Sequence, residues 1–395
     1  MSFTKIDLFQ PTEEHKLLRK MLQQFVKEKV EPQAAAFDKK EEFNLPLFRS
    51  LGDLGLLGLT VSEEFGGSNM DAVSAVIAHE ELSYSDPGFC LAYLAHSMLC
   101  VHNIYKNASN EQKKIYLPKL CSGEWVGAMA MSEPHVGTDI LGLKTQAKNK
   151  GDHYIINGRK MWITNGTIDE KGTLADVVLL YSQTESKDNK AQLSTFILNP
   201  QCKGFSVGQK IQDKMGMRAS NTAELVLDQC VAPLDTLMGT EGSSIIHMMR
   251  NLELERLTLA AMSLGIAKRC LDIMNRYAKE REAFGKSLSH FGQIQKYIAD
   301  SFAEYWACRS YVYNVARQLD FNSQGQRLHS DGVKLVTSTM AKKVADRAIQ
   351  VLGGYGYVSE YHVERLYRDA KLLEIGGGTI EAHQKNITKD LARSL

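Results

Sequence analysis

Residues 251–265, NLELERLTLAAMSLG, carry the pattern around which the rest of the chain is organised. Leu252, Leu259 and Met262 recur at helical spacing and no proline interrupts the run, so this segment is predicted to be one amphipathic helix. Glu255 lies on the same stripe as Leu259, one turn earlier. A carboxylate in line with apolar side chains is partly desolvated, which raises its pKa and suits a general base near neutral pH.

Arg256 follows Glu255 and points about 100° away around the helix, where a guanidinium could meet an anionic group. The alternative interpretation is that Glu255 and Arg256 are ordinary surface charges. This segment alone leaves both open, and the surrounding sequence has to decide between them.

The surrounding chain divides into three regions by its periodicity. Residues 1–127 are predicted to be helical, with Thr12 capping the first helix. Residues 128–238 form short alternating runs rich in β-branched and aromatic residues, in which Asn157-Gly158 has the composition of a tight hairpin turn. Residues 239–395 return to long helical patterns. Because helices and strands are segregated, we expect an α+β fold with a helical, a mostly antiparallel β and a second helical domain.

Composition excludes several classes of protein. The 395 residues are 44% hydrophobic and 24% charged with a net charge of +1, so a nucleic-acid partner is not expected. No apolar run approaches a membrane span, and membrane insertion is not expected. Seven cysteines with no CxxC pair favour buried thiols over disulfides or a metal site. We expect a cytoplasmic protein, or a mitochondrial matrix protein if a leader has been removed.

Two segments of the β region combine glycine, hydroxyl and aromatic residues. Residues 129–139, MAMSEPHVGTD, offer hydroxyls and backbone N–H groups to a phosphate or a flavin edge, although a plain loop would look the same. Residues 160–166, KMWITNG, place Trp162 beside Thr164, so that the indole could cover a flat ring. The alternative for Trp162 is a place in the β core.

Two further segments lie in the second helical region. In residues 281–286, REAFGK, Arg281 could hold a pyrophosphate and Phe284 could pack on a ring. A basic helix end followed by a glycine cap explains the same residues structurally. Residues 350–357, QVLGGYGY, precede the glycines of residues 375–379, IGGGT. Three consecutive glycines are costly in chain entropy, which favours close approach of a ligand to the backbone.

Taken together, these segments resemble the acyl-CoA dehydrogenase family across essentially the whole chain. The motifs occur in the family's order and are AMSEPHVGTD, KMWITNG, DKMGMRASNTAEL, REAFGK, QVLGGYGY and RDAKLLEIGGGT. The resemblance implies a C-terminal four-helix bundle, a non-covalent FAD, and a homotetramer. It also implies α,β-dehydrogenation of an acyl-CoA substrate, with electrons passed to electron-transferring flavoprotein.

The position of the base distinguishes branches of this family. Most members carry a glutamate directly before the family's Gly-Thr, and here that position is Gly377. The isovaleryl-CoA and long-chain branches carry the glutamate on the helix of residues 251–265, where Glu255 matches it. The resemblance therefore implies that Glu255 removes the pro-R α-proton while the β-hydrogen leaves as hydride. The N–H of Gly377 and a ribityl hydroxyl of FAD would stabilise the thioester oxygen.

The resemblance also implies further site residues. Arg256 would contact the CoA portion, and Gly376, where straight-chain enzymes have a bulky tyrosine, would leave room for a branched acyl group. The residues expected at FAD are Met131, Ser132, Gly137, Thr138, Trp162, Thr164, Thr379 and Glu381, with Arg281, Phe284, Gln350, Gly353 and Gly354 reaching the FAD of a neighbouring subunit. The residues expected at the substrate are Leu99, Thr138, Glu253, Arg256, Leu259, Gly376, Gly377 and Gly378.

The predicted substrate is a short branched-chain acyl-CoA similar to isovaleryl-CoA. The alternatives are a long-chain, cyclic or carrier-protein-bound acyl thioester, since one methylene in an apolar pocket changes binding by only about 1–3 kcal/mol. A non-catalytic flavin-binding subunit and an oxidase that reacts with oxygen are the alternatives of a different class.

Overall fold

The first part of the chain folds into helices, as its periodicity predicts. The computed structural model describes residues 7–185, 191–321 and 327–394. The hydroxyl of Thr12 accepts a hydrogen bond from the backbone N–H of His15, which confirms the predicted cap. The helices are α1 (Glu13–Phe25), α2 (Glu31–Lys40), α3 (Leu45–Asp53), α4 (Ala72–Ser85), α5 (Pro87–Leu94), α6 (His102–Asn107) and α7 (Asn110–Ser122), with π-helical turns at Val26–Val30 and Ala95–Val101.

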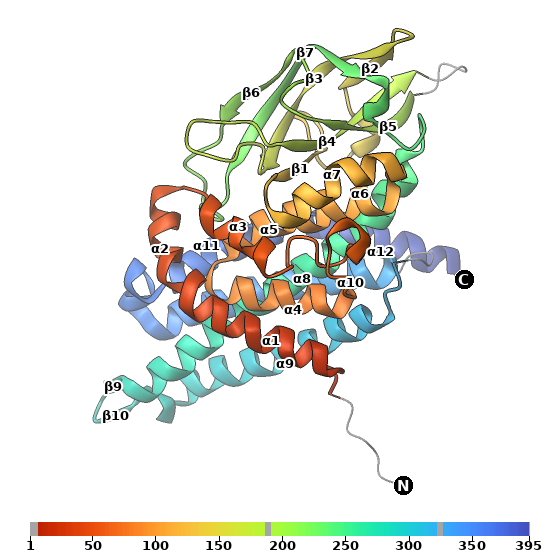
Figure 1. Cartoon of the computed structure of the whole chain (residues 1–395). Helices are drawn as coiled ribbons and strands as arrows, with labels where there is room; N and C mark the ends of the chain where they lie inside the picture. Colours follow the sequence, from red (N-terminus) through yellow and green to blue (C-terminus); the bar gives the residue numbers. More distant parts are fainter. Residues whose placement is uncertain (1–6, 186–190, 322–326, 395) are drawn as a thin grey trace.

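The central region is an eight-stranded sheet that lies at one end of the molecule (Figure 1). Its strands are β1 (Gly127–Ala130), β2 (Gln146–Asn149), β3 (His153–Thr164), β4 (Val177–Glu185), β5 (Ala191–Leu198), β6 (Phe205–Lys210), β7 (Thr222–Pro233) and β8 (Leu237–Met238). The order is β6-β7-β3-β2-β4-β5-β8, with β1 beside β4. The prediction of an antiparallel sheet holds for most pairs, but β4 runs parallel to both β1 and β2.

The predicted hairpin at Asn157-Gly158 is wrong. Both residues lie inside β3, which continues through them to Thr164. The register against β7 shifts at this point, and the side-chain oxygen of Asn157 accepts a hydrogen bond from the N–H of Gln229 at 2.8 Å. A Cβ on Gly158 would come within 2.7 Å of the Cα of Thr145. The glycine therefore serves a β-bulge with close backbone packing, which has the same local composition as a turn.

The C-terminal region is again helical, and its longest element is central to the molecule. It contains α8 (Ser244–Glu280), the hairpin β9 (Glu282–Ala283) and β10 (Lys286–Ser287), α9 (Gly292–Gln318), α10 (Arg327–Leu352), α11 (Val363–Leu373) and α12 (Ile380–Ser394). Helix α8 packs against α10 on one side and α4 on the other (Figure 1). Gly265 allows the close approach to α4, because a Cβ there would overlap the Glu80 carbonyl and the Ser83 hydroxyl.

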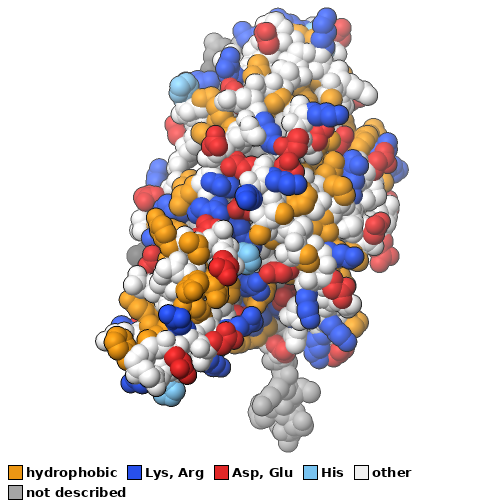
Figure 2. Space-filling view, turned by 90° about the vertical axis from the view of Figure 1, so that its left-hand side faces the viewer, with side chains coloured by type: hydrophobic (Ala, Val, Ile, Leu, Met, Phe, Trp, Pro, Cys, Tyr) orange, Lys and Arg blue, Asp and Glu red, His pale blue; other side chains and the backbone are white. Residues whose placement is uncertain are grey.

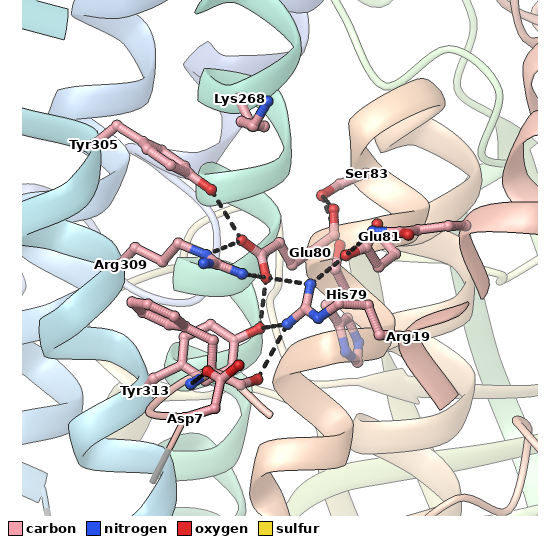
Figure 3. Close-up of polar contacts among 12 residues, drawn as sticks. Asp7, Arg19, His79, Glu80, Glu81, Ser83, Lys268, Tyr305, Arg309 and Tyr313 are labelled. Carbon is pink, nitrogen blue, oxygen red and sulfur yellow. Dashed lines mark hydrogen bonds and ion pairs between the residues drawn. The ribbon is translucent and has the colours of Figure 1, made fainter. Parts of the chain in front are cut away.

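A buried ion-pair network joins α1, α4 and α9 (Figure 3). Glu80 of α4 accepts hydrogen bonds from Arg309 at 2.7 Å, from Arg19 at 3.0 Å and from the hydroxyl of Tyr305 at 3.2 Å. Tyr313 also donates to Glu80, and Arg19 has Glu81 as a second partner. Burial alone would raise the pKa of Glu80, but Arg309 and Arg19 hold it at about 2. One ionised carboxylate thus links three helices that are far apart in sequence.

The surface agrees with the near-zero net charge. In Figure 2, side chains of both signs are interspersed with hydrophobic groups over the face that is shown. Within residues 7–185, 191–321 and 327–394, no helix is both long and apolar enough to cross a membrane. The same residues contain no cluster of three or more His, Cys, Asp or Glu side chains that could hold a metal ion. All seven cysteines are free and buried.

Candidate active site

Glu255 is buried in the middle of the protein rather than displayed on its surface. Its side chain lies on α8, the residue is 7% exposed, and one carboxylate oxygen has no hydrogen-bond partner. Burial raises the pKa of Glu255 to about 7, against the opposing charges of Arg256 and Lys334. The interpretation of Glu255 as a surface charge is therefore wrong. An unpaired buried carboxylate with a pKa near neutrality has the properties of a general base.

The glycine turn after α11 approaches this carboxylate directly. A Cβ on Gly377 would lie 3.4 Å from the nearer oxygen of Glu255 and would overlap the Leu259 side chain. Gly377 has φ +67° and Gly378 has φ +104°, conformations that glycine adopts readily. The fold therefore brings together the two positions at which the resemblance implies a base, and only Glu255 supplies a carboxylate.

Arg256 is committed to a partner within the protein. The residue is 8% exposed, and its guanidinium lies 3.2 Å from Asp331 of α10. The same Asp331 oxygen lies 2.5 Å from Nδ1 of His383 on α12. Nε2 of His383 lies 3.0 Å from the carbonyl oxygen of Gly378. A buried chain of polar contacts thus runs from α8 to the glycine turn. The Nε of Arg256 has no hydrogen-bond partner, and its contact with the CoA portion stays a prediction.

Lys334, one turn beyond Asp331 on α10, is also fully buried. Its ammonium donates a hydrogen bond to the carbonyl of Leu373, the last residue of α11. Burial lowers the pKa of Lys334 to about 8, while the negative charge of Glu255 favours its protonated form. Sequence reasoning missed Asp331, Lys334 and His383. The available signal was a pair of charges at i, i+3 inside an otherwise apolar helix stripe.

The first two candidate segments meet where the chain that leaves β1 passes β3. The N–H of Met161 donates to the carbonyl of Ser132 at 2.9 Å. The buried Lys160 donates to the carbonyl of Met131 at 3.0 Å and to Glu133 at 2.8 Å. These contacts hold residues 131–133 beside residues 160–162. Met131 belongs to the same buried hydrophobic cluster as Met248 of α8, the helix that carries Glu255.

Trp162 lies outside the β core. Its indole is 63% exposed and its backbone has φ +65°, at a second register shift between β3 and β7. The alternative of a core tryptophan is therefore wrong. The exposed indole can stack on a flat ring such as a flavin, and the hydroxyls of Ser132 and Thr164 can form hydrogen bonds with the polar edge of that ring. Gly137 has no atom within 4 Å of where its Cβ would be, and Thr138 is exposed beside it.

The remaining candidate segments form a second site at the far end of α8. An open hollow of about 560 Å³ is lined by Arg281, Gly354 and Tyr355, among others. Phe284 is 96% exposed at the tip of the β9–β10 hairpin, with φ +52°. Glu255 and Arg281 are separated by about 39 Å along α8 at 1.5 Å per residue. The two groups of candidate residues are thus not brought together within one chain.

Comparison with known proteins agrees with this division of the chain. The N-terminal, middle and C-terminal domain models of acyl-CoA dehydrogenase match residues 12–124, 128–230 and 245–392. The chain belongs to the acyl-CoA dehydrogenase family. It is an FAD-dependent oxidoreductase with the family's helical, β and helical domains.

Individual relatives of this acyl-CoA dehydrogenase cover nearly its full length. The mitochondrial isovaleryl-CoA dehydrogenase of Oryza sativa is 41% identical over 386 residues, which is 97% of this chain and 92% of that protein. A chain of the solved structure described as the electron transferring flavoprotein of Acidaminococcus fermentans has a TM-score of 0.92 and 35% identity, with both chains fully covered. Glutaryl-CoA dehydrogenase of Mycobacterium smegmatis in complex with FADH2 has a TM-score of 0.90 and 28% identity, covering 99% of this chain and 98% of that one.

Four other expected substrate residues of this acyl-CoA dehydrogenase lie on α8, in a π-helical turn and in the glycine turn after α11. Leu259 is buried one turn along α8, and Glu253 is buried two residues before the base. Leu99 is half-buried in the π-helical turn at Ala95–Val101, a type of helix irregularity that often occurs at functional sites. Gly376 has only ordinary contacts, to Leu372, where its Cβ would be. A small side chain at residue 376 would therefore fit, and its absence leaves free volume.

Proposed function

We propose that this acyl-CoA dehydrogenase oxidises a short branched-chain acyl-CoA, similar to isovaleryl-CoA, to the enoyl-CoA with Glu255 as the base. The observation that carries the proposal is the buried Glu255 carboxylate, with one unbonded oxygen, next to Gly377. A base for an α-proton has to be desolvated enough to be strong and near enough to a group that stabilises the developing enolate. The backbone N–H of Gly377 is that neighbour.

The roles of the residues follow from this arrangement. Glu255 in its ionised form takes the α-proton and holds it on the carboxylate. The N–H of Gly377 donates to the thioester oxygen, where negative charge develops as the proton leaves. Bound FAD supplies the acceptor for the β-hydrogen, which leaves as hydride. Leu259 closes the site beside Glu255 and keeps water from the carboxylate.

Two glycines support a branched substrate. Gly376 and Gly377 both lack side chains on the turn that faces Glu255 and Leu259. The free volume at residue 376 can take a methyl branch near the reacting carbons. The relative from Oryza sativa that acts on isovaleryl-CoA, by its name, supports the same substrate class. A long-chain, cyclic or carrier-protein-bound thioester is the second candidate, since the same free volume can pass a longer chain.

The cofactor residues support a homotetramer in which subunits share FAD sites. Trp162, Ser132 and Thr164 would hold the flavin ring of their own subunit, and the resemblance assigns Thr379 and Glu381 to the same FAD. Arg281 follows the far end of α8, and Gly354 lines the same hollow, so we assign this second site to the FAD of a neighbouring subunit. The residues assigned to it are Arg281, Phe284, Gln350, Gly353 and Gly354. The 96% exposure of Phe284 in the single chain fits a side chain that is covered by another subunit.

We further propose electron-transferring flavoprotein as the electron acceptor, a reducing compartment as the location, and 1–127, 128–238 and 239–395 as the domain boundaries. The similarity to a chain of the solved structure described as an electron transferring flavoprotein supports the first proposal. Seven buried, free thiols support the second. The ends of α7 at Ser122 and of β8 at Met238 support the third.

The substrate is tested by anaerobic titration of the FAD-loaded enzyme with isovaleryl-CoA, octanoyl-CoA and palmitoyl-CoA, followed by loss of the flavin absorbance. Stoichiometric bleaching by isovaleryl-CoA is the expected result. Bleaching only by the longer chains would move the enzyme to the second candidate and keep Glu255 as the base. Absence of bleaching by all three, with FAD bound, would contradict the proposed reaction. Rapid turnover with oxygen alone would contradict the proposed acceptor.

The reaction should depend on pH through the ionisation of Glu255. Burial raises the pKa of Glu255 to about 7, and only the ionised form accepts a proton. We therefore expect kcat/KM to rise about tenfold per pH unit below pH 7 and to level off above about pH 8. Stopped-flow measurement of flavin reduction at low acyl-CoA concentration between pH 5.5 and 9 checks this. A flat profile across pH 6–8 would contradict the assignment.

A further inference from the structure

The turn that presents Gly377 to the substrate has no side chain of its own to fix it. Residues 376–378 are all glycine, and two of them have positive φ. A glycine backbone has more accessible conformations than any other residue, so an unsupported turn would move. A catalytic N–H that is misplaced by about 1 Å can cost on the order of 100-fold in rate. The contacts that hold this turn therefore matter for the reaction.

Lys334 holds the side where the chain enters the turn. Its fully buried ammonium donates to the carbonyl of Leu373, at the end of α11. That carbonyl is one of the groups at a helix end that lack an intrahelical partner. A charged donor inside the protein makes a stronger hydrogen bond than a neutral one, and it fixes where α11 ends and the glycines begin.

Asp331 and His383 hold the side where the chain leaves the turn. Nε2 of His383 lies 3.0 Å from the carbonyl oxygen of Gly378, and Nδ1 lies 2.5 Å from Asp331. Both ring nitrogens of His383 are therefore held, one by the carboxyl group and one by the turn. Asp331 and His383 are fully buried, and Asp331 is also paired with Arg256.

The two contacts originate from a single helix. Asp331 and Lys334 are one turn apart on α10, on the face that meets α8, α11 and α12. Asp331 also pairs with Arg256, which is the residue next to Glu255 on α8. Side chains of α10 therefore contact both the helix that carries Glu255 and the segments on either side of the glycine turn.

We propose that Asp331, His383 and Lys334 are positioning residues that clamp the glycine turn at both ends and so hold the Gly377 N–H in line with the thioester oxygen. The inference rests on the proposed function, because it assigns a task to that N–H. None of the three side chains needs to touch the substrate. They act by fixing the position of the Gly377 N–H, which does contact the substrate in the proposed function.

The test compares His383→Leu, His383→Gln and Lys334→Met with the wild-type FAD enzyme. The direct readout is the infrared stretching frequency of 3-methylbut-2-enoyl-CoA labelled with ¹³C at the carbonyl, bound to the oxidised protein. An aligned N–H polarises this carbonyl and lowers its frequency. We expect His383→Leu and Lys334→Met to lose at least about half of the wild-type shift, and kcat to fall about 10- to 100-fold with KM changed less than about threefold. Rates are compared over the whole range from pH 6 to 9, so that a change in the pKa of Glu255 or the loss of the Lys334 charge is distinguished from a rate that is lower at every pH.

Asp390→Asn is the matched control. Asp390 pairs with Arg327 and so joins the same two helices, α10 and α12, without contacting the turn. It should keep both the carbonyl shift and kcat, which separates a loosened helix pair from a misplaced turn. His383→Gln should keep more of the shift than His383→Leu, since an amide can still donate to Gly378. FAD absorbance and melting temperature verify that each variant is folded.

The outcomes distinguish the two proposals. If wild type lowers the carbonyl frequency and both His383→Leu and Lys334→Met retain the full shift while folded, the clamp is wrong. If wild type binds the ligand but shows no shift, the assignment of the Gly377 N–H in the proposed function fails instead. If Asp390→Asn loses as much of the shift as His383→Leu, the effect belongs to helix packing in general, and the clamp is again wrong.

Discussion

Glu255→Gln should retain FAD but lose about 10²- to 10⁴-fold in the rate of flavin reduction by the acyl-CoA, because the amide cannot accept the α-proton. The substitution keeps the size of the side chain, and Gly377 offers no second carboxylate. The measurement is anaerobic single-turnover flavin reduction, combined with exchange of the substrate α-hydrogen in D₂O. Both signals should fall together, since proton removal is common to the two.

The control for this experiment lies on the same helix. Asp272 of α8 pairs with Lys268 at the surface, and Asp272→Asn removes a carboxylate that has no place in the proposed site. It should reduce the flavin at the wild-type rate. A Glu255→Gln enzyme that turned over at a rate near wild type would show that another group takes the proton.

The same substitution carries a stability prediction with a defined sign. The pKa of Glu255 is raised in the folded protein, so its neutral form is favoured there, and this contribution is complete below about pH 4.5 and lost as the pH rises through 7. Ionised Glu255 therefore destabilises the folded state at pH 8. Glu255→Gln should melt at a temperature no lower than wild type at pH 8, which separates loss of activity from loss of structure.

Glu80→Gln should destabilise the protein by about 3–5 kcal/mol, because it leaves the buried Arg309 without its carboxylate partner. Arg19 also loses one of its two carboxylate partners, Glu80 and Glu81. For a chain of this length, that loss corresponds to a fall of about 5 °C in melting temperature. Differential scanning calorimetry at pH 7 measures it. The expected cause is the penalty of an unpaired buried charge, which exceeds the value of the ion pair itself.

Glu304→Gln is the matched control for the buried network. Glu304 of α9 pairs with Arg347 of α10, and its side chain is 38% exposed, so its removal should cost less than about 1 kcal/mol. Equal melting temperatures for Glu80→Gln and wild type would show that the three-helix network contributes nothing. The difference in melting temperature between wild type and Glu80→Gln should also shrink below pH 4.5. The pKa of Glu80 is lowered in the folded protein, so the stability that its ionised form contributes is lost as the pH falls toward 2.

Local sequence patterns were sufficient for the order of the regions and for the helix that carries Glu255. The spacing of Leu252, Leu259 and Met262 defined a helix, and that helix fixed the face on which Glu255 lies. Periodicity is a property of neighbours along the chain, so it can be read without the fold. The same reasoning failed at Asn157-Gly158, because a bulge and a turn share one composition, and only the partner strand β7 distinguishes them.

Tertiary structure decided what surrounds that base. The family motifs implied a catalytic role for Gly377, which stays a prediction, but its approach to Glu255 and Leu259 is a contact between α8 and a turn more than 100 residues later. Asp331, Lys334 and His383 have no motif of their own, and their meaning depends on α10 and α12 packing around that turn. A sequence determines which side chains are present and which helix face each occupies. Which buried charges face one another depends on helix packing, because burial and pairing arise only between elements that the chain brings together from a distance.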